Sequence, residues 1–208
     1  LWPADFLPSQ ASAEAGQSLL AQGVVPADEI DLLVHAAVCR DRLEPATASY
    51  VHNLMGLGSR TQILDVSNAC LGMLNGVLQA ANMIQLGQVQ AALVVGTESS
   101  RALVETTIDA LNRQTDLTRN QIKPALASLT IGSASCAILL THRDISQTGN
   151  ALLSAVATAN TSHHELCHSG QDEAADAAMS PLMTTDSETL LREGIATGTV
   201  AFETFLAE

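Results

Sequence analysis

Basic residues are scarce in this sequence. Its 208 residues include nine Lys plus Arg against 22 Asp plus Glu, which gives a formal net charge of −13 at pH 7. Nucleic-acid-binding proteins normally carry a basic patch, because their partner is a polyanion. The nearest approach to one is the loose set Arg113, Arg119 and Lys123, which is either solvated surface charge or a contact for an anionic carrier. We therefore predict that the protein does not bind nucleic acid.

Aromatic side chains are also rare. They make up 2% of the residues, whereas 47% are hydrophobic and 15% are charged. The core must therefore be built from Ala, Leu, Val and Ile, which suits helices packed on a buried parallel sheet. Disordered chains combine low hydrophobicity with many charges, so this composition excludes disorder. A chain of this length buries a full core and forms one domain or a small pair.

Charged residues are absent altogether from residues 66–97. That gap is long enough to imitate a membrane-spanning helix. Four amides recur within it at helical spacing, at Asn75, Gln79, Asn82 and Gln85. A lipid-facing helix would not carry such a polar stripe. We predict a helix buried inside the protein, followed by a strand, and no membrane span.

Cysteine is present at four positions, Cys39, Cys70, Cys136 and Cys167. No secretory signal opens the printed sequence, so a disulfide framework has little support. Cys39 ends an apolar run and Cys136 lies inside one, which predicts reduced, buried thiols. We therefore expect a cytoplasmic protein.

Helical and strand-like patterns alternate along the chain. Helices are predicted at residues 12–22, 46–56, 71–86, 101–112 and 187–206, and strands at residues 30–38, 62–67, 91–96, 133–141 and 151–159. This βαβαβ order with continuous apolar strands predicts an α/β fold, a mostly parallel sheet covered by helices on both faces. Chemistry in such sheets lies at the carboxyl ends of the strands, where Cys39, Cys70 and the turn at residues 96–100 fall. Asp186 or Ser187 is expected to cap the last helix.

Cys70 stands at the junction between a predicted strand and a helix without charges. A thiol there feels the positive end of the helix dipole, which favours the reactive thiolate. Its neighbours Ala69 and Gly72 leave room for a close approach, and backbone N–H groups at such a junction can stabilise an oxyanion. The alternative is a small buried core cysteine, which is the commoner role of this residue type.

Glu44 lies between a strand end and Pro45, which is suited to the first position of a helix. A glutamate there either complements the helix dipole or acts as a general base. The run HHELCH at residues 163–168 has metal-ligand types at short spacing but no second pair downstream, so we favour a surface loop over a zinc site. Ser99 and Ser100 lack the glycine-rich fingerprint and lysine of a nucleotide site.

Three stretches together resemble the thiolase superfamily, in its ketoacyl synthase III branch. They are DVSNACLGMLNG (residues 65–76), ALVVGTESS (residues 92–100) and LTIGSASCAILLT (residues 129–141). The order and spacing of the family are kept over nearly the whole chain. The resemblance implies a thiolase-like fold in which Cys70 is the nucleophile and the helix behind it is hidden at the centre.

Within that branch, residues 38–58 and 182–195 are most similar to the olefin-biosynthesis thiolases of the OleA type. These enzymes join two fatty acyl-CoA molecules head to head. The resemblance implies a homodimer in which Cys70 takes an acyl group from acyl-CoA. It also implies that Glu44 of the neighbouring subunit removes a proton from a second acyl-CoA, and that non-decarboxylative Claisen condensation yields a β-ketoacyl-CoA without a cofactor.

Two alternatives stay open. One is the function of 3-oxoacyl-[acyl-carrier-protein] synthase III, in which malonyl-carrier protein is the partner and decarboxylation forms the carbanion, so that Glu44 has no role. The second alternative is a chain without catalytic activity that only forms a dimer. Family members carry their catalytic His and Asn in a second half beyond the position of Glu208. We therefore expect residues 1–160 to form the N-terminal, cysteine-bearing half, and residues 161–208 to be a polar loop and a helix leading into a C-terminal half.

Overall fold

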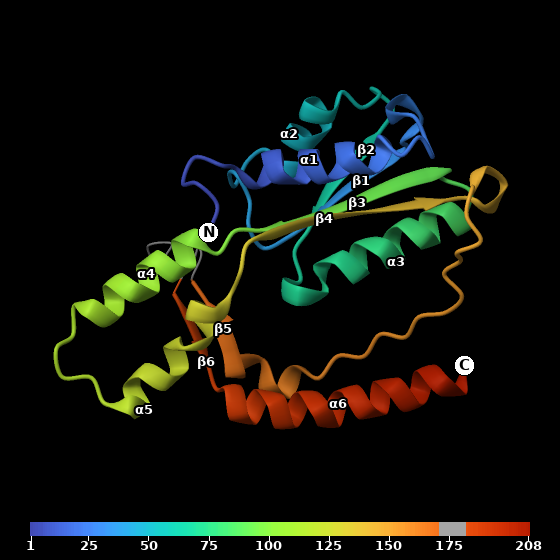
Figure 1. The fold of residues 1–208 in the computed structure, drawn as a ribbon. Helices are drawn as coiled ribbons and strands as arrows, with labels where there is room; N and C mark the ends of the chain where they lie inside the picture. Colours follow the sequence, from blue (N-terminus) through green and yellow to red (C-terminus); the bar gives the residue numbers. More distant parts are fainter. Residues whose placement is uncertain (171–181) are drawn as a thin grey trace. The chain divides into compact units, whose positions relative to one another are not determined.

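The computed structural model describes residues 1–170 and 182–208 (Figure 1). The chain divides into two compact units. The first consists of Leu1–Ser99 and Ser133–Leu152, and the second of Ser100–Gly132 and Leu153–Glu208. The predicted boundary at residue 160, between the cysteine-bearing N-terminal half and a loop and helix leading into a C-terminal half, is of a different kind and stays a prediction.

A four-stranded sheet forms the centre of the first unit, in the order β2-β1-β3-β4. Its strands are β1 (Leu32–Ala36), β2 (Gln62–Val66), β3 (Ala91–Glu98) and β4 (Ala134–Thr141). Strand β1 pairs in parallel with both β2 and β3, whereas β4 runs antiparallel to β3. The predicted α/β fold with a mostly parallel sheet is confirmed.

Helices cover both faces of this sheet, as predicted. Figure 1 shows α1 (Pro8–Leu20) and α2 (Thr47–Met55) on one face and α3 (Gly72–Gln85) on the other. Because side chains alternate along a strand, β1 contributes to both cores. Leu33 packs in the cluster under α1 and α2, and Leu32 and Val34 pack in the cluster under α3.

Two glycines let α3 lie close to the sheet. A Cβ atom added at Gly76 would lie 2.8 Å from Cγ1 of Val94, and one at Gly96 would lie 2.8 Å from the carbonyl oxygen of Ala36. Both separations are shorter than side chains tolerate, so larger residues would push the helix away from the strands. The close contact fixes where the amino end of α3 meets the sheet.

The outer face of α3 is exposed. Leu71 and Leu74, at the start of the helix, are 55% and 59% exposed. The prediction of a fully buried helix is therefore wrong for this face, because the sheet covers only the side that carries Gly72, Gly76, Ala80 and Met83. Among the helices of the described residues, none combines the length and apolarity needed to cross a membrane.

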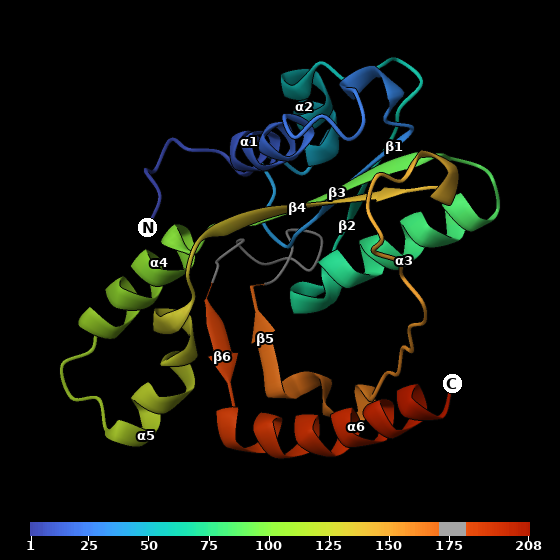
Figure 2. The ribbon, with the colours of Figure 1, turned by 45° about the vertical axis from the view of Figure 1, so that its right-hand side comes forward.

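The second unit contains α4 (Arg101–Asn112), α5 (Arg119–Ile122) and α6 (Ser187–Ala207). A short antiparallel hairpin pairs β5 (Cys167–Ser169) with β6 (Met183–Thr185), and Figure 2 shows β6 leading into α6. The Asp186 carboxylate caps α6 by accepting a hydrogen bond from Thr189 N (3.1 Å), which lowers the pKa of Asp186 and confirms the predicted cap. Short 3₁₀ helices span Ala27–Glu29, Ala69–Leu71, Lys123–Ala125, Ala127–Thr130, Arg143–Ile145 and Thr161–Leu166.

Two local predictions are wrong. Residues 151–159 form no strand, because an isolated apolar run is not stable as a strand and this one pairs with neither edge of the four-stranded sheet, β2 or β4. Cys136 is exposed rather than buried, because it lies on the edge strand β4, where alternate side chains point away from the core. Its thiol is nevertheless free, as are those of Cys39, Cys70 and Cys167.

Candidate active site

The junction between β2 and α3 presents Cys70 to solvent. Strand β2 ends at Val66, and a single 3₁₀ turn over Ala69–Leu71 leads into the helix. Ala69 has a φ of 42°, the left-handed conformation that residues with a side chain rarely adopt. Strained backbone of this kind concentrates at functional sites, where it fixes the direction of the next side chain. The structure therefore places Cys70 at a sharp, exposed strand-to-helix turn.

Glu44 lies in the connection between β1 and α2, and its side chain is exposed. Because β1 and β2 are parallel neighbours, Glu44 and Cys70 both follow the carboxyl ends of adjacent strands. No hydrogen bond or ion pair joins the two residues within the described chain. The Glu44 side chain is therefore accessible to a molecule that binds at the carboxyl ends of the strands.

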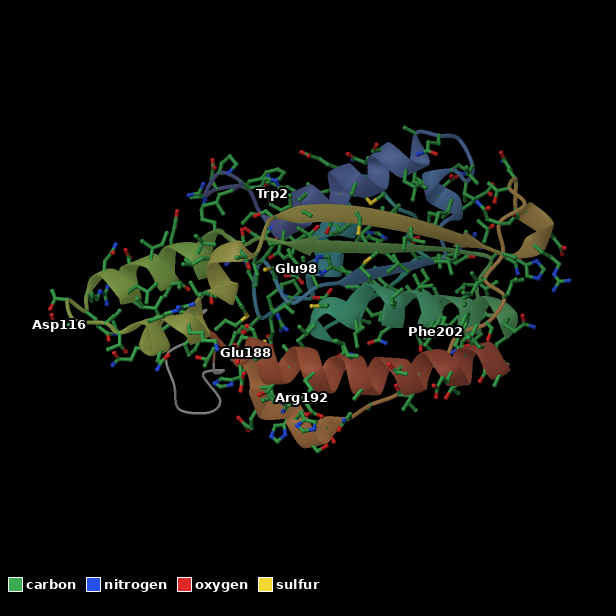
Figure 3. All side chains as sticks on the ribbon, turned by 60° about the horizontal axis from the view of Figure 1, so that its bottom comes forward. Trp2, Glu98, Asp116, Glu188, Arg192 and Phe202 are labelled. Atoms are coloured by element: carbon green, nitrogen blue, oxygen red, sulfur yellow. The ribbon has the colours of Figure 1, made fainter. Side chains whose placement is uncertain are left out.

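The ends of the connection that carries Glu44 are held by carboxylates from other strands. Glu98, at the end of β3 and labelled in Figure 3, accepts hydrogen bonds from Val38 N (2.7 Å) and Cys39 N (3.2 Å). Asp65, on β2, accepts hydrogen bonds from two backbone N–H groups at the start of α2. The sequence interpretation missed both anchors. Glu98 ends the buried strand β3, which is a usable signal, but Asp65 lies within β2, whose residues are exposed or half-buried.

Cys39 is a structural thiol rather than a second nucleophile. Its Sγ lies 3.4 Å from Ser99 N and 3.5 Å from Ser99 O, so the side chain bridges the ends of two strands. Burial, followed by the neighbouring Glu98 carboxylate, raises the pKa of Cys39 to about 11. A thiol needs its thiolate form to react, so Cys39 is unreactive at neutral pH.

The rate of alkylation should therefore distinguish Cys39 from the exposed cysteines. Because the pKa rises from 9.0 to about 11, native Cys39 should react with iodoacetamide about 100-fold more slowly than an unperturbed thiol. Exposed Cys136 serves as the internal reference in the same sample, and peptide mass spectrometry after timed quenching gives both rates. Labelling of Cys39 at the rate of Cys136 would contradict the structural assignment.

Three other features make contacts that stabilise the fold: His52 on α2, the loose basic set, and the HHELCH run. Nε2 of His52 lies 3.0 Å from the carbonyl oxygen of Gly58, and Lys123 Nζ donates to Glu188 Oε1 at 2.7 Å, so part of the loose basic set is neutralised. Across residues 1–170 and 182–208, no group of three or more His, Cys, Asp or Glu side chains is arranged to hold a metal ion. The HHELCH run instead spans a 3₁₀ helix and the first residues of β5.

Comparison with known proteins decides the family. The family model described as thiolase, N-terminal domain, matches residues 4–175. The chain belongs to the thiolase family. The matched region of this thiolase includes the strand-to-helix junction that carries Cys70.

Two curated relatives match this chain along all of the sequence given. The acyl-CoA:acyl-CoA alkyltransferase of Shewanella oneidensis is 38% identical, and the protein of the same name from Xanthomonas campestris is 31% identical. The alignments cover 100% of this chain but only 60% and 57% of the relatives, so the chain spans little more than half of their length. The β-ketoacyl-[acyl-carrier-protein] synthase III of Rhodospirillum centenum is 34% identical over 48% of this chain and 30% of its own.

Solved structures of Xanthomonas campestris OleA have the same fold. One OleA variant superposes with a TM-score of 0.87 at 30% identity, covering 98% of this thiolase and 57% of that chain. A second, crystallised with bound lauric acid and lauroyl-CoA, gives a TM-score of 0.88 at 29% identity, covering 98% of this chain and 58% of that chain. Other OleA structures carry replacements of a glutamate or a cysteine.

Proposed function

We propose that this chain supplies the nucleophile and the base of an acyltransferase that joins two acyl-CoA molecules without decarboxylation. The observation that carries the proposal is the exposed Cys70 on its left-handed turn at the start of α3. The relatives named acyl-CoA:acyl-CoA alkyltransferase support the reaction class, and the OleA complex with lauroyl-CoA supports an acyl-CoA substrate.

The proposed reaction begins with transfer of an acyl group to Cys70. The thiolate attacks the thioester carbonyl of the first acyl-CoA, and the CoA thiolate leaves. The Glu44 carboxylate of a second copy then takes a proton from the α-carbon of another acyl-CoA. The resulting carbanion attacks the acyl-cysteine carbonyl, Cys70 leaves as a thiolate, and a β-ketoacyl-CoA is released. None of these steps changes an oxidation state or needs a metal ion, so we propose no further cofactor.

The spacing of the two residues supports their assignment. The glutamate and the cysteine replaced in the OleA structures are separated by the same number of residues as Glu44 and Cys70. A histidine replaced in other OleA structures lies further beyond that cysteine than Glu208 lies beyond Cys70. We therefore propose that the catalytic histidine of the complete active site does not come from residues 1–208.

A homodimer is part of the proposal, because it allows Glu44 to serve a neighbouring site. Within the described residues β2 is an edge strand, and its Ile63 is 40% exposed. Exposed strand edges are ready-made surfaces for pairing with another chain, and symmetric dimers are the commonest assemblies. We further propose a cytoplasmic role in lipid metabolism, in olefin biosynthesis. Acidic carrier proteins are less favoured partners, because like charges slow encounter.

The choice of extender tests this function. The naturally expressed protein should form β-ketoacyl-CoA from long-chain acyl-CoA alone, measured by mass spectrometry of the CoA products. Addition of malonyl-carrier protein should not raise the yield. Product that forms only with malonyl-carrier protein would indicate the decarboxylating synthase, and no product with either would favour a chain that only dimerises.

A further inference from the structure

Both flanks of the Glu44 connection are tied to the sheet by carboxylates. On the β1 side, Glu98 accepts the N–H groups of Val38 and Cys39 at 2.7 and 3.2 Å. On the α2 side, Asp65 accepts the N–H groups of Thr47 and Ala48, each at 2.8 Å. Residues between the two ties have few degrees of freedom left, so the ties determine where the exposed Glu44 side chain can reach.

Asp65 replaces the local cap that α2 lacks. The N-cap residue of α2 is Ala46, whose side chain cannot accept a hydrogen bond. The first N–H groups of a helix have no partner inside the helix, and a carboxylate is a favourable one because it also complements the helix dipole. The cap therefore comes from the neighbouring strand β2, which also leads to Cys70.

A buried histidine lies directly beside this carboxylate. His35 is the parallel-strand partner of Asp65, it is 1% exposed, and its Nδ1 lies 3.9 Å from Oδ1 of Asp65. Burial lowers the pKa of His35 even though Asp65, Asp41 and Glu98 pull the other way. The lowered pKa favours the neutral imidazole at pH 7, and the 3.9 Å separation places its ring beside the Asp65 carboxylate.

Asp41 completes the arrangement from within the connection. Its Oδ1 accepts a hydrogen bond from Ser9 N at the start of α1 (2.9 Å), and its N–H lies 3.4 Å from Oγ1 of Thr47. The connection is thus fastened to α1, to α2 and to two strands. Among the described residues, Oδ2 of Asp41 and Nε2 of His35 are buried without a hydrogen-bond partner, which is uncommon for buried polar atoms.

We infer that Asp65 is a positioning residue that sets the reach of Glu44 through the start of α2. The inference rests on the proposed function, in which Glu44 removes the α-proton while Cys70 alone accepts the acyl group. In this role Asp65 acts through the backbone N–H groups of Thr47 and Ala48 and not on the reacting atoms. Loss of its carboxylate should therefore slow carbon–carbon bond formation and spare acylation.

The test compares two half-reactions in Asp65→Asn. Acylation is followed by intact mass after mixing with acyl-CoA, and condensation by the yield of β-ketoacyl-CoA. Small misplacements of a catalytic group cost up to about 100-fold in rate, so we expect condensation to fall roughly 10- to 100-fold while acylation stays near the wild-type rate. Hydrogen exchange should also quicken at Thr47 and Ala48.

Asp31→Asn is the matched control. The Asp31 carboxylate also accepts two backbone N–H groups, from Gln90 (2.7 Å) and Ala91 (3.3 Å), but at the opposite ends of the strands. Its loss should change both half-reactions by the same factor. Thr47→Pro is a second variant, because it removes one N–H donor at the first helical position, where proline is tolerated. It also removes the hydroxyl beside Asp41 N, so Thr47→Ala, which loses only that hydroxyl, is its baseline. Thr47→Pro should reproduce the selective loss even if Asp65→Asn does not fold.

The outcomes separate the inference from the proposed function. Equal losses in both half-reactions of Asp65→Asn, or unchanged condensation, would overturn the positioning role. Absence of β-ketoacyl-CoA with the wild-type protein would overturn the proposed function instead. Hydrogen exchange would then still test whether Asp65 anchors the start of α2, because unchanged exchange at Thr47 and Ala48 in Asp65→Asn would refute that contact.

Discussion

Cys70→Ala is expected to abolish the acyl adduct entirely. Wild-type protein mixed with a long-chain acyl-CoA should gain the mass of one acyl group, because the exposed Cys70 side chain at the start of α3 attacks the thioester. Alanine has no nucleophile, so neither adduct nor β-ketoacyl-CoA should form. Intact-mass spectrometry of the denatured protein after short incubation measures the adduct directly.

Cys136→Ala provides the matched control for this experiment. Cys136 is also an exposed, free cysteine, but it lies on the edge strand β4 and not at a strand-to-helix turn. The control should acquire the adduct at the wild-type rate. Retention of the acyl adduct by Cys70→Ala would show that another residue is the nucleophile.

Glu44→Gln is expected to separate acylation from condensation. Acylation of Cys70 does not use Glu44, so the adduct should form normally, whereas removal of an α-proton needs a base within hydrogen-bond reach. General bases contribute roughly 10²- to 10⁴-fold, so β-ketoacyl-CoA should fall at least about 100-fold. The Glu44 side chain is exposed and makes no hydrogen bond with the residues that the structure describes. We therefore expect the variant to fold normally.

Exposed Glu29 offers the corresponding control, because Glu29→Gln removes the same charge away from the β1–α2 connection. It should leave both half-reactions unchanged. Near-normal product formation by Glu44→Gln would remove the main reason for preferring the non-decarboxylating reaction over the malonyl-dependent synthase.

Local sequence patterns were sufficient for the central sheet. Strands β1 and β3 are continuous apolar runs, and such runs are buried wherever helices cover both faces of a parallel sheet. The apolar run at residues 151–159 has the same local pattern but no strand beside it, so it stays irregular. Pairing partners are a property of the whole fold and cannot be seen in a short window.

The candidate site was predictable only in part. The position of Cys70 between a strand and a helix follows from the adjoining patterns, but the left-handed turn at Ala69 does not, because a residue with a side chain rarely adopts it. The anchors Asp65 and Glu98 were missed for a different reason. Each caps backbone groups that are distant in sequence, so no local capping motif announces them.

Subunit complementation tests the central claim most directly. The claim is that Cys70 of one copy works with Glu44 of another, so neither Cys70→Ala nor Glu44→Gln should make β-ketoacyl-CoA alone. After the two variants are unfolded and refolded together, each mixed dimer should contain one intact site, built from the thiol of one variant and the carboxylate of the other. Random pairing in a symmetric dimer should restore about one quarter of the wild-type activity.

The formation of mixed dimers is checked by native mass spectrometry with one variant carrying an affinity tag. Recovery of β-ketoacyl-CoA synthesis in the mixed dimers is the predicted result. Mixed dimers that remain as inactive as the separate variants would contradict the account, because they would show that Cys70 and Glu44 must act within the same copy or do not act together.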